Sequence, residues 1–255
     1  MENSIYTYVD KFPDFASKIP ESQIVSGSEI RTNCETFKKS TTYQGNETEF
    51  INKCTNIVNY IDTVKLDVSS IPAYFKYINY WFYDTLKDID PFLSNDLLNS
   101  FYNKISKLSD YQSHKKPIKK EIYNELKDLY NLHEHLIKYK KDSTLESKPS
   151  CDDGDKGAEL YESYVVKCKW MQNYDYCNSL KKFREEYEKH SSQENKCLVK
   201  MQYLTPFTSF GSWLRPRLPG GKNKTKKLEK KMQELQNTPD DRNSRYKLPY
   251  HSSYS

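Results

Sequence analysis

The sequence predicts an all-α protein, a bundle-like set of helices followed by a disordered basic tail, and three observations lead there. Apolar residues recur at three- and four-residue spacing along most of residues 1–200, as in helices that bury one face. Glycine is scarce, with 7 in 255 residues, which disfavours folds built on tight turns or phosphate-binding glycine loops. Hydrophobic residues reach only 36%, yet there are 22 tyrosines, so the core must use amphipathic rings.

The first half of the chain contains three helical segments. Glu49–Asp62 places one apolar stripe along a helix, made of Phe50, Ile51, Cys54, Ile57, Val58 and Ile61. Ala73–Leu86 is richest in aromatic residues and is expected to be the central core helix. Asn95–Lys107 repeats the stripe with Leu97, Leu98, Phe101, Tyr102 and Ile105, and Ser94 is its expected N-cap.

The longest predicted helix is Lys119–Lys141. Its apolar face consists of Ile122, Tyr123, Leu126, Leu129, Tyr130, His133, Leu136 and Ile137. A polar break, Ser143–Gly157, is expected to be a loop. Helical spacing then resumes, first with Leu160, Tyr161, Tyr164, Val165 and Cys168 and later with Cys177, Leu180, Phe183 and Tyr187. We expect one helical domain over residues 1–200, with a subdivision at the loop 143–157 as the alternative.

The positive charge is concentrated in residues 201–255. This tail holds eleven basic and four acidic residues, a net charge of +7, whereas the whole chain carries +5. The body is therefore near neutral, which argues against a nucleic-acid partner. We expect the Pro- and Lys-rich tail to be disordered, with one short helix near Lys226–Gln236 and with the capacity to contact an anionic membrane.

Six cysteines, Cys34, Cys54, Cys151, Cys168, Cys177 and Cys197, show no CxxC spacing and no zinc-like grouping with histidine. Their even number suits three disulfides, and it equally suits six buried thiols in a reducing cytosol.

No reaction chemistry is indicated. His133 and His135 lie two apart on a helix and point in different directions, so a shared metal ion is not expected. Cys151–Gly157 lacks the alternating acids and the bidentate glutamate of a calcium loop. Without a nucleophile elbow, P-loop or dinucleotide fingerprint, we expect neither an enzyme nor a cofactor. No signal peptide and no stretch of ~20 apolar residues is visible, so a transmembrane helix is not expected either.

Three segments together resemble a known family. The first is AYFKYINYWFYDTL, with Tyr74, Phe75, Tyr77, Tyr80, Trp81, Tyr83 and Leu86. The second is the spaced set Cys168, Tyr174, Cys177, Phe183 and Tyr187. The third, LTPFTSFGSWLRPRL, holds Pro206, Phe207, Gly211, Ser212, Trp213, Leu214 and Arg215. These segments resemble the Plasmodium interspersed repeat (PIR) superfamily, specifically its Vir-like variant antigens, in which the third segment follows a transmembrane helix.

The resemblance implies a function and a location. It implies an all-helical ectodomain with disulfides and without catalytic activity, exported by a malaria parasite to the infected red cell. There it would act in antigenic variation, immune evasion or adhesion to a host or parasite protein receptor, through Tyr- and Lys-rich faces. One departure is that Cys197–Tyr203 runs straight into the third segment without the usual apolar span, so the anchor is expected to be missing.

The alternative function is an intracellular or peripheral membrane scaffold. It would use the +7 tail to bind anionic lipid or a partner protein.

Overall fold

The computed structural model is helical in every element that it describes, which confirms the all-α prediction. It describes residues 4–19, 28–41, 43, 45–87, 94–146, 149–170, 174–193, 196–197 and 203–206. The α-helices are α1 (Phe12–Lys18), α2 (Glu29–Lys39), α3 (Glu47–Val64), α4 (Ile71–Leu86), α5 (Ser94–Lys104), α6 (Ser106–Ser109), α7 (Lys120–Asp142), α8 (Asp152–Val165) and α9 (Tyr174–Gln193). The 3₁₀ turns are η1 (Ile5–Lys11), η2 (Val68–Ser70), η3 (Gln112–His114) and η4 (Val166–Trp170).

All described residues belong to one compact unit, Met1–Trp213. The basic tail and its expected helix near Lys226–Gln236 lie outside the described residues, apart from 203–206.

Local signals in the sequence explain where the helices begin. The side chain of Ser28 accepts a hydrogen bond from the backbone nitrogen of Arg31 at 3.2 Å and caps α2. Asn46 caps α3 in the same way, through the nitrogen of Glu49. A proline in the first turn starts α4, where its missing N–H costs no helical hydrogen bond.

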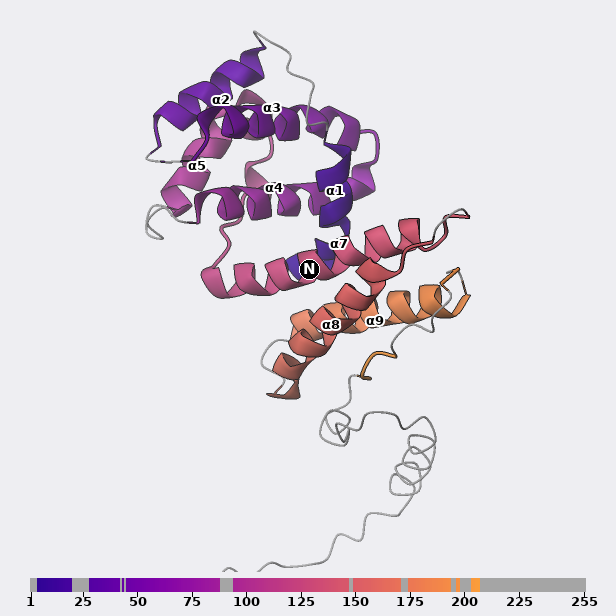
Figure 1. Cartoon of the computed structure of the whole chain (residues 1–255). Coiled ribbons are helices and arrows are strands. Elements are labelled where there is room, and N and C mark those ends of the chain that lie inside the picture. Colours follow the sequence, from indigo (N-terminus) through magenta and orange to yellow (C-terminus); the bar gives the residue numbers. More distant parts are fainter. Residues whose placement is uncertain are drawn as a thin grey trace, which may run out of the picture. The chain divides into compact units, whose positions relative to one another are not determined.

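Helix α7 lies between two groups of helices and contacts both (Figure 1). On one side it contacts η1, α1 and α4, and on the other it contacts α8 and α9. The helices α2, α3 and α5 continue the first group beyond α4, as Figure 1 shows. Buried residues from both groups form one continuous hydrophobic cluster.

The double role of α7 corrects part of its predicted face. The helix bounds agree with the prediction, and most of the predicted face is buried, but Ile137 is 40% exposed. Leu132 and Tyr139, which the prediction left out, are buried instead. A helix that packs on two sides buries a face that rotates along its length, so one straight stripe describes it poorly.

The predicted helix Asn95–Lys107 is interrupted. Ile105 leaves the helical conformation between α5 and α6. The free nitrogen of Ser106 then donates to the side-chain oxygen of Asn33 in α2 at 2.9 Å, so a neighbouring helix caps α6. Ser94, the expected N-cap, is the first residue of α5, and its side chain lies outside the described residues.

The predicted loop Ser143–Gly157 is wrong in its second half, because α8 already begins at Asp152. Three aspartates in the first turn favour a helix start through its dipole. Gly157 is buried, and a Cβ there would lie 3.5 Å from the ring of Phe183 and 3.6 Å from the Cβ of His135. These are ordinary van der Waals distances, so the buried site leaves room for a Cβ and does not require glycine.

Tyrosine supplies much of the core, as the composition predicts. Ten described tyrosines are buried: Tyr6, Tyr74, Tyr77, Tyr80, Tyr102, Tyr123, Tyr139, Tyr161, Tyr176 and Tyr187. Several hydroxyls donate to groups on distant elements. The Tyr102 hydroxyl donates to Oδ1 of Asn79 at 2.9 Å, whereas the buried Tyr139 hydroxyl has no hydrogen-bond partner among the described residues.

This difference predicts opposite effects for the same substitution. Tyr102→Phe should lower the free energy of unfolding by about 1–3 kcal/mol, because it leaves the buried Asn79 oxygen without its donor. Tyr139→Phe removes a hydroxyl that has no partner and should be neutral or stabilising. Urea unfolding of both variants measures this, and equal losses would contradict it.

Candidate functional site

The family-like helix α4 lies in the core. Tyr74, Phe75, Tyr77, Tyr80, Trp81 and Leu86 are buried, and Tyr83 is half-buried. The Tyr74 hydroxyl donates to the carbonyl oxygen of Ile57 at 2.6 Å, which ties α4 to α3. Burial raises the pKa of Tyr74 well above its ordinary value, so this hydroxyl remains a donor. These residues therefore build the interior and do not form an exposed recognition surface.

At the end of α4, one carboxylate joins two elements. Asp84 accepts hydrogen bonds from the Tyr123 hydroxyl of α7 and from the ammonium of Lys87. Burial, followed by the neighbouring Asp84, raises the pKa of Tyr123 to about 12. The ammonium of Lys87 lies 5.6 Å from the centre of the Tyr123 ring.

The middle of α4 carries a polar network that periodicity did not predict. The buried Asn79 accepts from Tyr102 and donates through Nδ2 to the carbonyl oxygen of His114 at 2.9 Å. The rings of His114 and Tyr111 both stack on the Phe75 ring, with centroid distances of 4.9 Å and 4.4 Å respectively. The feature of the sequence that could have predicted this network was the lone amide of Asn79 in an aromatic helix. The network fixes the segment before α7 against α4.

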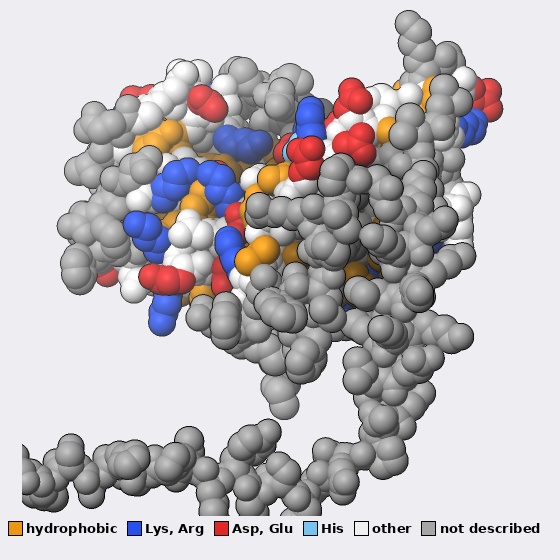
Figure 2. Space-filling view, turned by 60° about the horizontal axis from the view of Figure 1, so that its bottom comes forward, with side chains coloured by type: hydrophobic (Ala, Val, Ile, Leu, Met, Phe, Trp, Pro, Cys, Tyr) orange, Lys and Arg blue, Asp and Glu red, His pale blue; other side chains and the backbone are white. Residues whose placement is uncertain are grey.

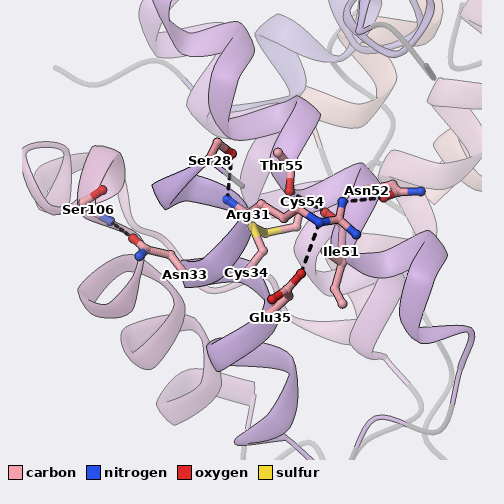
Figure 3. Close-up of a disulfide and its surroundings, with 10 residues drawn as sticks. All are labelled: Ser28, Arg31, Asn33, Cys34, Glu35, Ile51, Asn52, Cys54, Thr55 and Ser106. Carbon is pink, nitrogen blue, oxygen red and sulfur yellow. Dashed lines mark hydrogen bonds and ion pairs between the residues drawn. A yellow bond between two sulfur atoms is a disulfide. The ribbon is translucent and has the colours of Figure 1, made fainter. Parts of the chain in front are cut away.

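The six cysteines form three disulfides. Cys34–Cys54 joins α2 to α3 with Cα atoms 6.1 Å apart (Figure 3). Beside it, Arg31 donates to Asn52 of α3 at 2.9 Å and pairs with Glu35 at 3.1 Å. The hydrogen bond to Asn52 and the disulfide hold α2 against α3, while the pair with Glu35 lies within α2.

The other two disulfides lie around α8 and α9. Cys151–Cys197 spans 46 residues and ties the start of α8 to the chain beyond α9. Cys168–Cys177 spans 9 residues and closes the connection from η4 to α9. The sequence left disulfides and free thiols open, and the structure has no free cysteine among its described residues.

The third family-like segment begins against α8. Leu204 and Thr205 are buried, and Glu162 accepts hydrogen bonds from both the backbone nitrogen and the hydroxyl of Thr205. Tyr161 donates to the Thr205 carbonyl oxygen at 2.9 Å. Pro206 follows and is half-buried. The remaining motif residues, Phe207, Gly211, Ser212, Trp213, Leu214 and Arg215, lie outside the described residues.

The two histidines of α7 have separate surroundings. His133 is buried beside the Phe183 ring, whereas Nδ1 of His135 lies 2.7 Å from Asp153 at the start of α8. Burial lowers the pKa of His133 to about 4. The negative charges of Asp10 and Glu186 oppose this shift, and the positive charges of Lys140 and Lys182 add to it. Within the described ranges, no group of three or more His, Cys, Asp or Glu side chains could hold a metal ion.

The exposed surface is rich in lysine and poor in tyrosine. Figure 2 shows Lys and Arg side chains gathered on the left part of one face, with hydrophobic side chains among them. Most described tyrosines are buried, and among the large hydrophobic residues only Tyr174 and Tyr203 are strongly exposed tyrosines. Ten described tyrosines are buried in the core, so few strongly exposed tyrosines are left on the described surface.

None of the described helices is both long enough and apolar enough to cross a membrane. No protein-family model, curated protein or solved structure matches the chain.

Removing the longest-range disulfide should destabilise the protein. In the variant Cys151→Ser/Cys197→Ser, the free energy of unfolding should fall by about 4 kcal/mol, because the cross-link no longer restricts the unfolded chain. Both cysteines are only half-buried, so serine fits the folded state. Denaturant unfolding measures the loss. Under reducing conditions the variant and the wild type should unfold alike, and a difference that persists there would contradict this origin.

The buried His133 predicts acid sensitivity. Its folded pKa lies below the unfolded value of ~6.5, so its neutral form contributes stability above pH ~6.5. That contribution is lost as the pH falls toward 4 and amounts to roughly 3 kcal/mol. His133→Phe should flatten the pH dependence of unfolding between these values, whereas His135→Gln should keep it. Urea unfolding from pH 7 to 4 tests this, and equal slopes in all three proteins would refute it.

Proposed function

We propose that this chain is a non-catalytic, Vir-like variant antigen, exported by a malaria parasite to the infected red cell. Its function would be antigenic variation, immune evasion or adhesion to a protein receptor. The proposal rests on the sequence resemblance, and features of the folded unit support it.

The observation that carries the proposal is the pairing of all six cysteines within one helical unit. Disulfides persist in oxidising surroundings and are rare in the reducing cytosol. Three disulfides in the described residues therefore favour an oxidising location outside the parasite cytosol. They fit an intracellular scaffold poorly.

The position of the family-like residues gives further support. Those of α4, and Cys168, Cys177, Phe183 and Tyr187, are buried or half-buried, whereas Tyr174 of the same set is 72% exposed. A shared interior preserves the fold, while exposed residues can change with little cost to stability. This division suits an antigen whose surface varies on a constant scaffold. The contact surface would then be carried by exposed polar and charged side chains of the helices.

Staining of infected red cells tests the location. Antibodies raised against residues 1–200 should label intact cells, with an antibody to a cytosolic parasite protein as the negative control. Labelling that requires permeabilisation would contradict display and favour the scaffold that uses the basic tail.

The redox state of the same material provides an independent measurement. Peptide mapping of non-reduced protein should yield the linked pairs Cys34–Cys54, Cys151–Cys197 and Cys168–Cys177. Six alkylated free thiols in protein from infected cells would argue against an oxidising location.

A further inference from the structure

The segment that leads into α7 carries four lysines in six residues. Its sequence is KKPIKK, with Lys115, Lys116, Lys119 and Lys120. Lys115 is half-buried, and the other three lysines are exposed. Residues 115–119 are not helical, and α7 begins at Lys120. A short run of lysines on a protein surface is typical of sites for polyanions.

The backbone of this segment is held against the body of the protein. The side-chain amide of Asn79 donates to the carbonyl oxygen of His114 at 2.9 Å, and the His114 ring stacks on Phe75. Ile118 is only 8% exposed and joins the hydrophobic cluster. Pro117 fixes its own φ and favours extended backbone at the residue before it. The lysines therefore stand on a backbone that is already ordered, which lowers the entropic cost of binding.

The charge of the segment is not neutralised by neighbouring acids. Lys119 and Lys120 form no ion pair with a carboxylate of the described residues. Lys115 donates to the neutral side-chain oxygen of Gln112 at 3.0 Å, which leaves its charge uncompensated. Lys116 takes part in other interactions, and no part of the site depends on it.

Helix stability does not account for the lysines at the start of α7. A helix N-terminus is the positive end of the dipole, where a further cation is unfavourable. Lys119 is the N-cap residue and provides no side-chain hydrogen bond to the first turn. Glu121 is the one acidic residue of that turn. These lysines therefore oppose the local electrostatics of the helix, and a bound anion would relieve that repulsion.

The surroundings of the lysines favour one class of polyanion. Protein interfaces are enriched in aromatic residues and arginine and are depleted in lysine, and none of the strongly exposed large hydrophobic residues of the described surface lies in residues 115–120. Membrane-surface segments insert an apolar face, whereas Ile118 is buried in the core. A sulfated polysaccharide requires only spaced cations, because its sulfates repeat along the chain and stay ionised.

We propose that residues 115–120 bind a sulfated glycosaminoglycan. The polysaccharide lies along the segment, with its sulfates near the ammonium groups of Lys115, Lys119 and Lys120. This inference deepens the adhesion proposed above. It rests on that function for the place where the protein meets a host-cell polysaccharide, whereas the binding itself is a property of the purified chain.

Calorimetric titration of the full chain with a heparin hexasaccharide, at several salt concentrations, tests the proposal. We expect saturable binding that weakens as the salt concentration rises. The variant Lys119→Gln/Lys120→Gln should bind about tenfold more weakly, with a smaller salt dependence, because two ion contacts are lost. Both residues are exposed and make no side-chain contact that the fold needs, and circular dichroism checks the fold.

The matched control is Lys141→Gln/Lys156→Gln. Both of these lysines are exposed, and neither forms an ion pair with a described carboxylate. Lys141 lies at the opposite end of α7, and Lys156 lies in α8. This variant loses the same charge, and its basic tail is unchanged, so binding should change less than about twofold. An equal loss in both variants would overturn the proposal, because binding would then follow the net charge.

Other polyanions provide the remaining comparison. Unsulfated hyaluronan should bind several-fold more weakly than heparin, and equal affinity would overturn the requirement for sulfate. If Lys119→Gln/Lys120→Gln lost binding to phosphatidylserine vesicles but kept binding to heparin, the segment would be a lipid site instead. Absence of saturable heparin binding would refute the site even if antibodies label intact cells. Heparin binding through these lysines without such labelling would support the site and contradict the display.

Discussion

Ten tyrosines are buried among the described residues, and the core must accommodate a hydroxyl with each of these rings; this constraint shapes the structure. An unpaired buried hydroxyl costs free energy, so the hydroxyls connect elements that are distant in sequence. Tyr74 connects α4 to α3, Tyr102 connects α5 to Asn79, and Tyr161 holds Thr205 against α8. Apolar packing supplies the driving force, and these directional contacts select one arrangement of the helices.

The disulfides act at positions that this tyrosine network leaves open. Cys34–Cys54 joins the pair α2 and α3, and Cys151–Cys197 and Cys168–Cys177 restrain the ends of α8 and α9. Helix α7 needs no such restraint, because it is packed on two sides. The three disulfides therefore restrain helices that lie on both sides of α7.

Periodicity predicted the helices because one apolar stripe in sequence corresponds to one buried face. It succeeded for α3 and for the bounds of α7, whose patterns are regular. It failed at Asp152–Gly157, where the polar composition suggested a loop, whereas α8 begins at Asp152 with three aspartates in its first turn. It also missed the break at Ile105, which depends on a cap from Asn33 in another helix. Cysteine pairing depends on tertiary proximity, which spacing along one segment does not contain.

The polar residues of α4 are the least explained by packing alone. An apolar side chain at residue 76 would avoid the cost of burying an ammonium in the most aromatic helix of the fold. Asn79 has a structural reason, since it fixes the segment before α7 through His114. Lys76 lies one helical turn from Asn79 on the same helix, where burial opposes its charged form and lowers its pKa.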